Sequence, residues 1–283
     1  MKTCLLFSIF MASLLSCTVT SEDAFKKAAI CEGDAFSIDD SKYKIILVIG
    51  QSNTHQGLGL DPNIDIPLKG VVQLGRFEER DMQLVDATEP LDHHTVKANR
   101  IGFALTFANL FKQELLAPED ALIIVPCGHS GTGFEDNMWN KGDTLYNDAV
   151  NRVNHLLKNY RGSKLQAILW HQGERDINNK NYENALTAFV EDIRTDLNQP
   201  NVPFILGGMV PYWVNQRFSR RKHQAIIAGI KNNVCYTAYA DPTSPFRIEK
   251  KDNSKDAVHY DAAGQREMGL RYFQEYLKLI ESN

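Results

Sequence analysis

The stretch IILVIGQSN, residues 45–53, determines the fold class that the sequence predicts. Its first five residues are a continuous, mostly β-branched run, as expected for a strand buried on both faces. Gly50 lets the chain turn sharply, so we expect Ser52 above the carboxyl edge of a sheet, where open α/β folds present their ligands. Ser and Asn also favour helix N-caps, and for these residues alone capping is the simpler interpretation.

The rest of the chain alternates apolar strands with amphipathic helices. Four more strands are predicted at residues 122–125, 167–170, 204–206 and 234–239. Helices are predicted at residues 101–115, 145–157, 182–197 and 262–280, the last with Asp261 as its N-cap. This order predicts a three-layer α/β/α sandwich with a five-stranded parallel sheet in a flavodoxin-like order. Residues 51–100 are irregular, and a long loop after the first strand is usually functional.

The composition limits the class of protein. The 283 residues are 43% hydrophobic and 23% charged, as in a soluble globular protein with a full core. We expect one large domain over residues 43–283. The net charge of -4 and the lack of a basic stripe argue against a nucleic-acid partner. Cys127 and Cys235 lie in or beside apolar strands, which predicts buried thiols, and no Cys/His spacing suggests zinc.

Residues 1–17 have the pattern of an export signal. Lys2 precedes a mostly apolar run over residues 4–15, which is too short to span a bilayer as a helix. The run ends in Leu14-Leu15-Ser16-Cys17, which resembles a bacterial lipobox and implies lipidation of Cys17. An ordinary secretory signal cut nearby is the alternative. We expect a periplasmic or cell-surface protein with a polar tether over residues 18–42 and no membrane contact beyond that anchor.

Two further segments supply the groups that a serine nucleophile needs. Asp256 and His259 are spaced i, i+3, so one turn places both on one face, and the carboxylate can hold the imidazole. A solvated loop is the alternative, and Asp261 is a rival partner that already caps a helix. In Trp170-His-Gln-Gly-Glu174, just past a strand, the Gln172 amide could donate to an oxyanion, whereas Trp170 is expected in the core. An ordinary polar turn is the alternative for that segment.

The segment CGHSGTG, residues 127–133, is similar to the nucleophile elbow of an α/β-hydrolase around Ser130. Counting from Gly128 rejects the match, because the fifth residue is Thr132 rather than glycine. Ser130 as nucleophile is therefore the minor alternative. We expect Gly131 to offer a second oxyanion donor through its backbone N–H.

These three blocks, in this order, resemble the SGNH/GDSL hydrolase superfamily. They are most similar to its sialate O-acetylesterase-like branch, which includes carbohydrate esterase family six. That branch has Gly-Gln-Ser-Asn where others have Gly-Asp-Ser, and a Gln-Gly-Glu block where others have Gly-x-Asn. The likeness continues at Val125-Pro126-Cys127, Gly131-Thr132, Trp139 and Leu145-Tyr146, and spans residues 45 to about 275.

The resemblance implies an esterase that removes acetyl groups from sugar hydroxyls, such as a sialate O-acetylesterase or an acetylxylan esterase. It implies Ser52 as nucleophile, His259 as base and Asp256 as its orienter, without a metal or organic cofactor. The oxyanion hole would be formed by the Ser52 N–H, Gly131 and Gln172. Asn53 and Glu174 would support the site, and Glu174 is the alternative partner of His259.

The chain departs from the family pattern in two places. Asn53 is followed by Thr54-His55-Gln56-Gly57 rather than Met-x-Gly, and His129-Ser130 precedes Gly131 where a glycine is common. These differences concern the substrate pocket more than the chemistry. Two other functions remain open: a catalytically silent surface glycan-binding lipoprotein, and a lipase or thioesterase of the same superfamily.

Overall fold

The structure is a computed structural model that describes residues 42–250 and 255–281. Its centre is a seven-stranded sheet in the order β4-β3-β6-β1-β7-β8-β9, in which only β4 runs antiparallel to its neighbour. The strands are β1 (Tyr43–Gly50), β3 (Val71–Leu74), β4 (Leu84–Asp86), β6 (Ala121–Pro126), β7 (Ser163–His171), β8 (Phe204–Gly207) and β9 (Thr237–Ala240).

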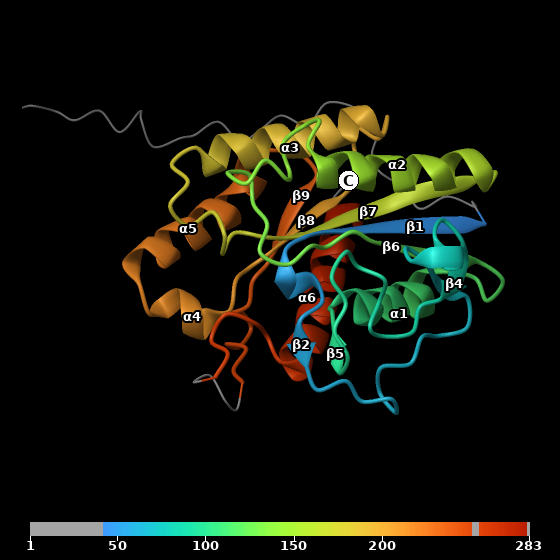
Figure 1. Ribbon diagram of the computed structural model, residues 1–283, viewed down its shortest axis with the longest axis horizontal. Helices are drawn as coiled ribbons and strands as arrows, with labels where there is room; N and C mark the ends of the chain where they lie inside the picture. Colours follow the sequence, from blue (N-terminus) through green and yellow to red (C-terminus); the bar gives the residue numbers. More distant parts are fainter. Residues whose placement is uncertain (1–41, 251–254, 282–283) are drawn as a thin grey trace, which may run out of the picture.

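Helices cover both faces of this sheet, so the molecule has the three predicted layers (Figure 1). Helices α2 and α3 lie on one face, and α1 and α6 pack together on the other. The helices are α1 (Ala104–Leu115), α2 (Thr144–Asn159), α3 (Tyr182–Asp196), α4 (Pro211–Asn215), α5 (Phe218–Gly229) and α6 (Ala262–Glu281). The predicted cap of α6 is confirmed, because the Gly264 N–H donates to Asp261 Oδ1 at 2.8 Å.

Strand β1 is central because it can be buried on both faces. Seven of its eight residues are buried, and it pairs in parallel with β6 on one side and β7 on the other. The five strands that the sequence predicts occupy the order β6-β1-β7-β8-β9. In chain order these are strands 2-1-3-4-5, so the flavodoxin-like topology is confirmed. The chain leaves β1 at the switch point, where its two neighbours diverge.

The predicted number of strands was wrong. Residues 51–100 are not wholly irregular, because β3 extends the sheet beyond β6 and β4 pairs with β3 at the edge. Both strands are short and lie among glycines and prolines, so periodicity did not identify them. A two-stranded ribbon of β2 (Gly57–Leu58) and β5 (Arg100–Ile101) was missed for the same reason.

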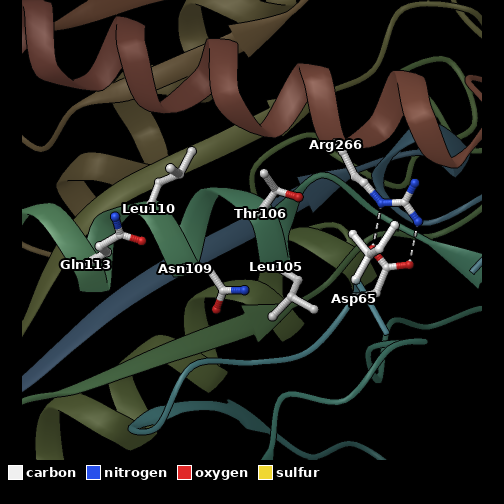
Figure 2. Close-up of a pocket in the computed structure, with 8 residues that line it drawn as sticks. Asp65, Leu105, Thr106, Asn109, Leu110, Gln113 and Arg266 are labelled. Atoms are coloured by element: carbon white, nitrogen blue, oxygen red, sulfur yellow. Dashed lines mark hydrogen bonds and ion pairs between the residues drawn. The ribbon is translucent and has the colours of Figure 1, made fainter. Parts of the chain in front are cut away.

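Part of this long segment is fixed to the helices by an ion pair. Arg266 of α6 donates to both carboxylate oxygens of Asp65, at 2.8 and 2.7 Å, beside a small pocket (Figure 2). Asn109 of α1 holds the same loop through the Leu68 N–H and the Ile66 carbonyl. The long loop after β1 therefore has defined anchors on α1 and α6.

The cysteine predictions were half right. Cys127 is a free, buried thiol, as predicted, and burial raises its pKa to about 12. Cys235 is disulfide-bonded, so its prediction as a thiol was wrong. The predictions for residues 1–41, including Cys17, lie outside the described residues. Within the described ranges, no helix has the length and apolarity to cross a membrane, and no cluster of acidic, His or Cys side chains could hold a metal.

Candidate active site

Ser52 lies in a one-turn helix, η2 (Ser52–Thr54), directly after β1. Gly50 makes this turn possible, because its φ is +122° and a Cβ there would lie 2.2 Å from the His171 carbonyl oxygen. The Gln51 N–H donates to that same carbonyl at 2.8 Å, and the His129 N–H donates to the Gly50 carbonyl at 3.0 Å. The ends of β1, β6 and β7 are thus brought together around Ser52.

Three of the predicted residues form a continuous chain of hydrogen bonds. The Ser52 Oγ lies 2.9 Å from His259 Nε2, and His259 Nδ1 lies 3.0 Å from each carboxylate oxygen of Asp256. The Asp256 carboxylate also accepts the His259 backbone N–H at 3.2 Å. This is the spacing that a nucleophile, a base and an orienting carboxylate require.

The Asp256 carboxylate is held in its charged form. Partial burial raises the pKa of Asp256. The hydrogen bond and the charge of His259, together with the charge of Lys250, lower it by a larger amount, so the pKa lies below its usual value. An ionised Asp256 favours the proton of His259 on Nδ1, which leaves Nε2 as an acceptor that faces Ser52 Oγ.

Asn53 connects the serine segment of the site with the histidine segment, whereas the sequence indicated only a supporting role for it. Its side chain is fully buried; Nδ2 donates to the Val258 carbonyl at 2.9 Å and to Glu174 Oε1 at 2.6 Å, and Oδ1 accepts the Tyr260 N–H at 3.1 Å. Val258 and Tyr260 flank His259 in the chain. Asn53 therefore fixes the histidine loop relative to the serine next to it.

Glu174 is not the partner of His259. It contacts Asn53 instead, and its Oε1 lies 4.0 Å from Nε2 of the buried His171. Burial raises the pKa of Glu174 to about 7, against the hydrogen bond from Asn53, which lowers it. Burial also lowers the pKa of His171 to about 3, so between about pH 3 and pH 7 these two groups face each other largely without charge. The alternative left open by the sequence is thereby resolved in favour of Asp256.

We expect the substitution Glu174→Gln to stabilise the protein more at pH 7 than at pH 4.5. The unfolded chain loses this proton near pH 4.5, whereas the folded chain retains it up to about pH 7. Over that range rising pH favours the unfolded chain, and above it the penalty stays constant, at about 3 kcal/mol. A neutral amide removes the penalty. Urea unfolding at both pH values measures it, with the exposed Glu114→Gln as control; equal differences at both pH values would contradict a raised pKa.

Two backbone N–H groups are available as oxyanion donors. Within the described residues, neither the Ser52 N–H nor the Gly131 N–H has a hydrogen-bond acceptor. Gly131 has a φ of +73°, is exposed, and has no atom within 4 Å of where a Cβ would lie. The chain on either side is fixed: the Ser130 N–H donates to Thr95 Oγ1, and the Phe134 N–H donates to Asp176. A free donor on a fixed loop is what an oxyanion hole needs.

The structure contradicts the expectation that the Gln172 amide donates to the oxyanion. This side chain is fully buried, and its Nε2 donates to Asp176 at 2.7 Å and to the Thr132 carbonyl at 3.3 Å. Its Oε1 accepts the Tyr182 hydroxyl at 2.9 Å. Both amide hydrogens are therefore occupied. Gln172 and Asp176 instead fix the loop that carries Gly131, a role that sequence position alone did not reveal.

We expect Gln172→Ala to lower the free energy of unfolding by about 1–3 kcal/mol, because it leaves the buried Asp176 and Tyr182 groups short of partners. Any loss of turnover should come only from displacement of the loop that carries Gly131, because the Gln172 amide does not donate to the oxyanion. Urea unfolding and ester hydrolysis measured together test this, with Gln113→Ala on the exposed part of α1 as control. A large loss of turnover at unchanged stability would return Gln172 to the oxyanion hole.

Ser130 does not have the surroundings of a nucleophile. Its Oγ lies 3.0 Å from His55 Nε2 and 3.0 Å from Thr95 Oγ1. Burial lowers the pKa of His55 to about 3, assisted by the charge of His259, so this histidine is a poor proton acceptor. The sequence did not indicate that His55 and Thr95 belong to the site, although the chain departs from the family pattern at Thr54-His55. They brace the peptide that precedes Gly131.

A cavity of about 630 Å³ opens beside His259. Its lining residues are Leu58, Arg100, Lys250, Lys255, Asp256, His259, Tyr260 and Asp261. Three of these side chains are cationic. Of the two carboxylates, Asp256 holds His259 and Asp261 caps α6. The cavity therefore places cationic side chains next to His259.

Comparison with known proteins agrees with this geometry. Residues 42–278 match the model of the family described as carbohydrate esterase, sialic acid-specific acetylesterase. A probable carbohydrate esterase of Arabidopsis thaliana is 29% identical over 209 residues, which cover 70% of this chain and 72% of the relative. The crystal structure of that plant protein has a TM-score of 0.69 at 25% identity, covering 83% of this chain and 98% of the plant chain.

The crystal structure of NanS has a TM-score of 0.71 at 19% identity, covering 87% of this chain and all of that one, and shows the shared fold. A three-layer α/β/α sandwich with Ser52, His259 and Asp256 brought together at its switch point is consistent with an esterase-type hydrolase, and the family match supports that class. The family match extends over most of the chain. The protein belongs to the sialic acid-specific acetylesterase family of carbohydrate esterases.

Proposed function

We propose that this protein is a serine acetylesterase that releases acetate from O-acetylated sugars. The observation that carries the proposal is the hydrogen-bonded chain from Ser52 Oγ through His259 to Asp256. In the first step Ser52 Oγ attacks the acetyl carbonyl carbon and His259 Nε2 accepts the serine proton. The Ser52 and Gly131 N–H groups stabilise the oxyanion that develops on the carbonyl oxygen.

The second half of the reaction regenerates the enzyme. The bond to the sugar oxygen breaks, and His259 gives its proton to that oxygen. Water then attacks the acetyl-Ser52 ester while His259 accepts a proton from the water, and acetate leaves as Ser52 recovers its hydrogen. Asp256 stays ionised throughout and stabilises the imidazolium each time it forms.

We further propose that the sugar carries a carboxylate. The cavity beside His259 has room for a sugar and is lined by Arg100, Lys250 and Lys255. The Lys250 ammonium donates to the His259 carbonyl at 2.7 Å, so a positive charge lies directly at the site. Cations at the rim of such a cavity favour an acidic sugar over a neutral one. The family description, which names sialic acid, supports the same choice.

The test is acetate release from O-acetylated sialic acid and from acetylated xylan by residues 18–283. We expect acetate to be released from small acetate esters and from the acidic sugar. We expect the acidic sugar to be preferred over xylan. A preference for xylan would overturn the acidic-sugar proposal but leave the esterase. A preference for octanoate over acetate esters would indicate a lipase instead. Glycan binding without release of acetate from any ester would indicate a binding protein.

We also propose that the protein is exported and lipid-anchored, on the basis of residues 2–17. Labelled palmitate should be incorporated into the full chain expressed in a bacterial host and lost on Cys17→Ala. Export with no label in the unaltered chain would indicate an ordinary secretory signal.

A further inference from the structure

The segment between α3 and the end of β9 has an unusual charge. Residues 197–240 contain Arg217, Arg220, Arg221, Lys222 and Lys231 but no Asp or Glu, in a chain whose net charge is -4. Four of these cations lie within six residues, at the turn from α4 into α5. A concentrated positive patch on a negative protein attracts anions to one place on its surface.

Aromatic side chains are interleaved with these cations. Phe218 is 63% exposed and Tyr212 is 39% exposed. The Arg220 guanidinium lies 3.8 Å from the centre of the Trp213 ring, and the Lys222 ammonium lies 4.9 Å from that of Phe218. We call this surface, formed by Tyr212, Trp213, Arg217, Phe218, Arg220, Arg221 and Lys222, the α4–α5 platform.

No described carboxylate neutralises the charges of the platform. Within residues 42–250 and 255–281, its cations make no ion pair with a carboxylate. Arg220 donates instead to the Trp213 carbonyl and Gln216 Oε1, and Arg221 donates to the Asn215 carbonyl. Burial and the neighbouring charge of Arg217 lower the pKa of Arg220, so these like charges are held close together. Such a cluster would gain from an external anion.

Helix α5, which carries part of the platform, packs against the loop that follows β7. On the inner side of α5, the ring of His223 packs on that of Tyr182 at 4.1 Å, and Tyr182 donates to Gln172. Gln224 accepts the Met209 N–H just after β8. A Cβ at Gly173 would lie 2.6 Å from Ile227 Cδ1. Figure 1 shows α4 and α5 at the side of the sheet where β1 ends.

We propose that the α4–α5 platform binds an acidic glycan chain outside the acetyl site, so that the enzyme works on units of a longer polymer. The guanidinium and ammonium groups match the carboxylates of such a chain, and the exposed rings offer flat apolar faces for its sugar rings. A sugar polymer is chosen because the inference rests on the proposed function. An anionic membrane, which cationic and aromatic surfaces also attract, is the competing occupant.

The first experiment measures binding of the unaltered protein and its Ser52→Ala variant to polygalacturonate, by retardation in native gels, with dextran as the neutral polymer. Both proteins should be retarded by polygalacturonate and not by dextran. The platform variant Arg217→Gln/Arg221→Gln/Lys222→Gln should bind about tenfold more weakly. The matched control Lys158→Gln/Arg161→Gln/Lys180→Gln removes three exposed cations elsewhere and should bind like the unaltered chain. Equal losses in both triple variants would overturn the inference.

A second variant separates glycan recognition from simple attraction between opposite charges. Tyr212→Ser/Phe218→Ser keeps every charge, and its exposed positions should leave the fold intact, which urea unfolding checks. We expect it to bind polygalacturonate about fivefold more weakly in 0.3 M salt, where charge attraction is screened. Unchanged binding would overturn the inference, as would binding to vesicles of anionic lipid without binding to polygalacturonate.

These measurements are independent of catalysis. A protein that hydrolyses phenyl acetate but is not retarded by polygalacturonate would disprove the platform alone. A protein that is retarded but releases no acetate would disprove the proposed esterase function alone.

Discussion

Replacing Ser52 with alanine should lower kcat/KM for an acetylated sugar by about 10⁴-fold or more, because the two-step reaction loses the atom that carries the acetyl group. What remains is direct attack by water, with His259 as its base and the N–H donors stabilising the oxyanion. The side chain is small and its only described hydrogen-bond contact is His259 Nε2. The free energy of unfolding should therefore change by about 1 kcal/mol or less. Acetate release and urea unfolding of the same preparation measure the two effects.

The control is Ser130→Ala, which removes the other serine hydroxyl that lies beside a histidine. Its loss of activity should stay below about tenfold, because His55 is too weakly basic to activate it. If Ser130→Ala were the inactive variant and Ser52→Ala the active one, the roles assigned to the two serines would be reversed.

Replacing Asp256 with asparagine should lower kcat by about 10³–10⁴-fold with little change in fold. The carboxylate fixes the proton on His259 Nδ1, and an amide that donates to the same nitrogen favours the wrong tautomer. The geometry is retained, so KM should change less than kcat. Initial rates at saturating substrate measure the loss, and circular dichroism confirms the fold.

The comparison with Glu174→Gln makes the Asp256 result decisive. That variant keeps the hydrogen bond to Asn53 in a neutral group, and we expect it to retain at least about a tenth of the activity. A loss for Glu174→Gln as large as for Asp256→Asn, at unchanged stability, would mean that Glu174 takes part in proton transfer.

The parts of the fold that follow from periodicity were predicted correctly. The run at residues 45–49 is too apolar and too β-branched for anything but a buried strand, and β1 lies at the centre of the sheet. The helices that cover the sheet have clear apolar faces. Strands β3 and β4 were missed because three or four residues beside glycine and proline give no period, and they form only by pairing with β6.

The sequence predicted those parts of the site that depend on the type of residue. It did not predict those that depend on the direction in which a side chain points. Ser52, Asp256 and His259 meet as their spacing and strand positions implied. The direction of the Gln172 amide depends on Asp176 and Tyr182, which pull it away from the substrate. Likewise, Asn53 was recognisable in the motif, but its contacts with Val258 and Tyr260 depend on a loop more than 200 residues away.

That separation has a consequence for how the protein acquires its function. Ser52 and His259 are 207 residues apart in the chain, and they meet only when the segment before α6 lies against the turn after β1. Contacts between such distant residues form late, because closing a long loop costs entropy that local packing must first offset. Ester hydrolysis during refolding therefore reports the arrival of the final segment, whereas the fluorescence of the buried Trp170 reports the earlier assembly of the core.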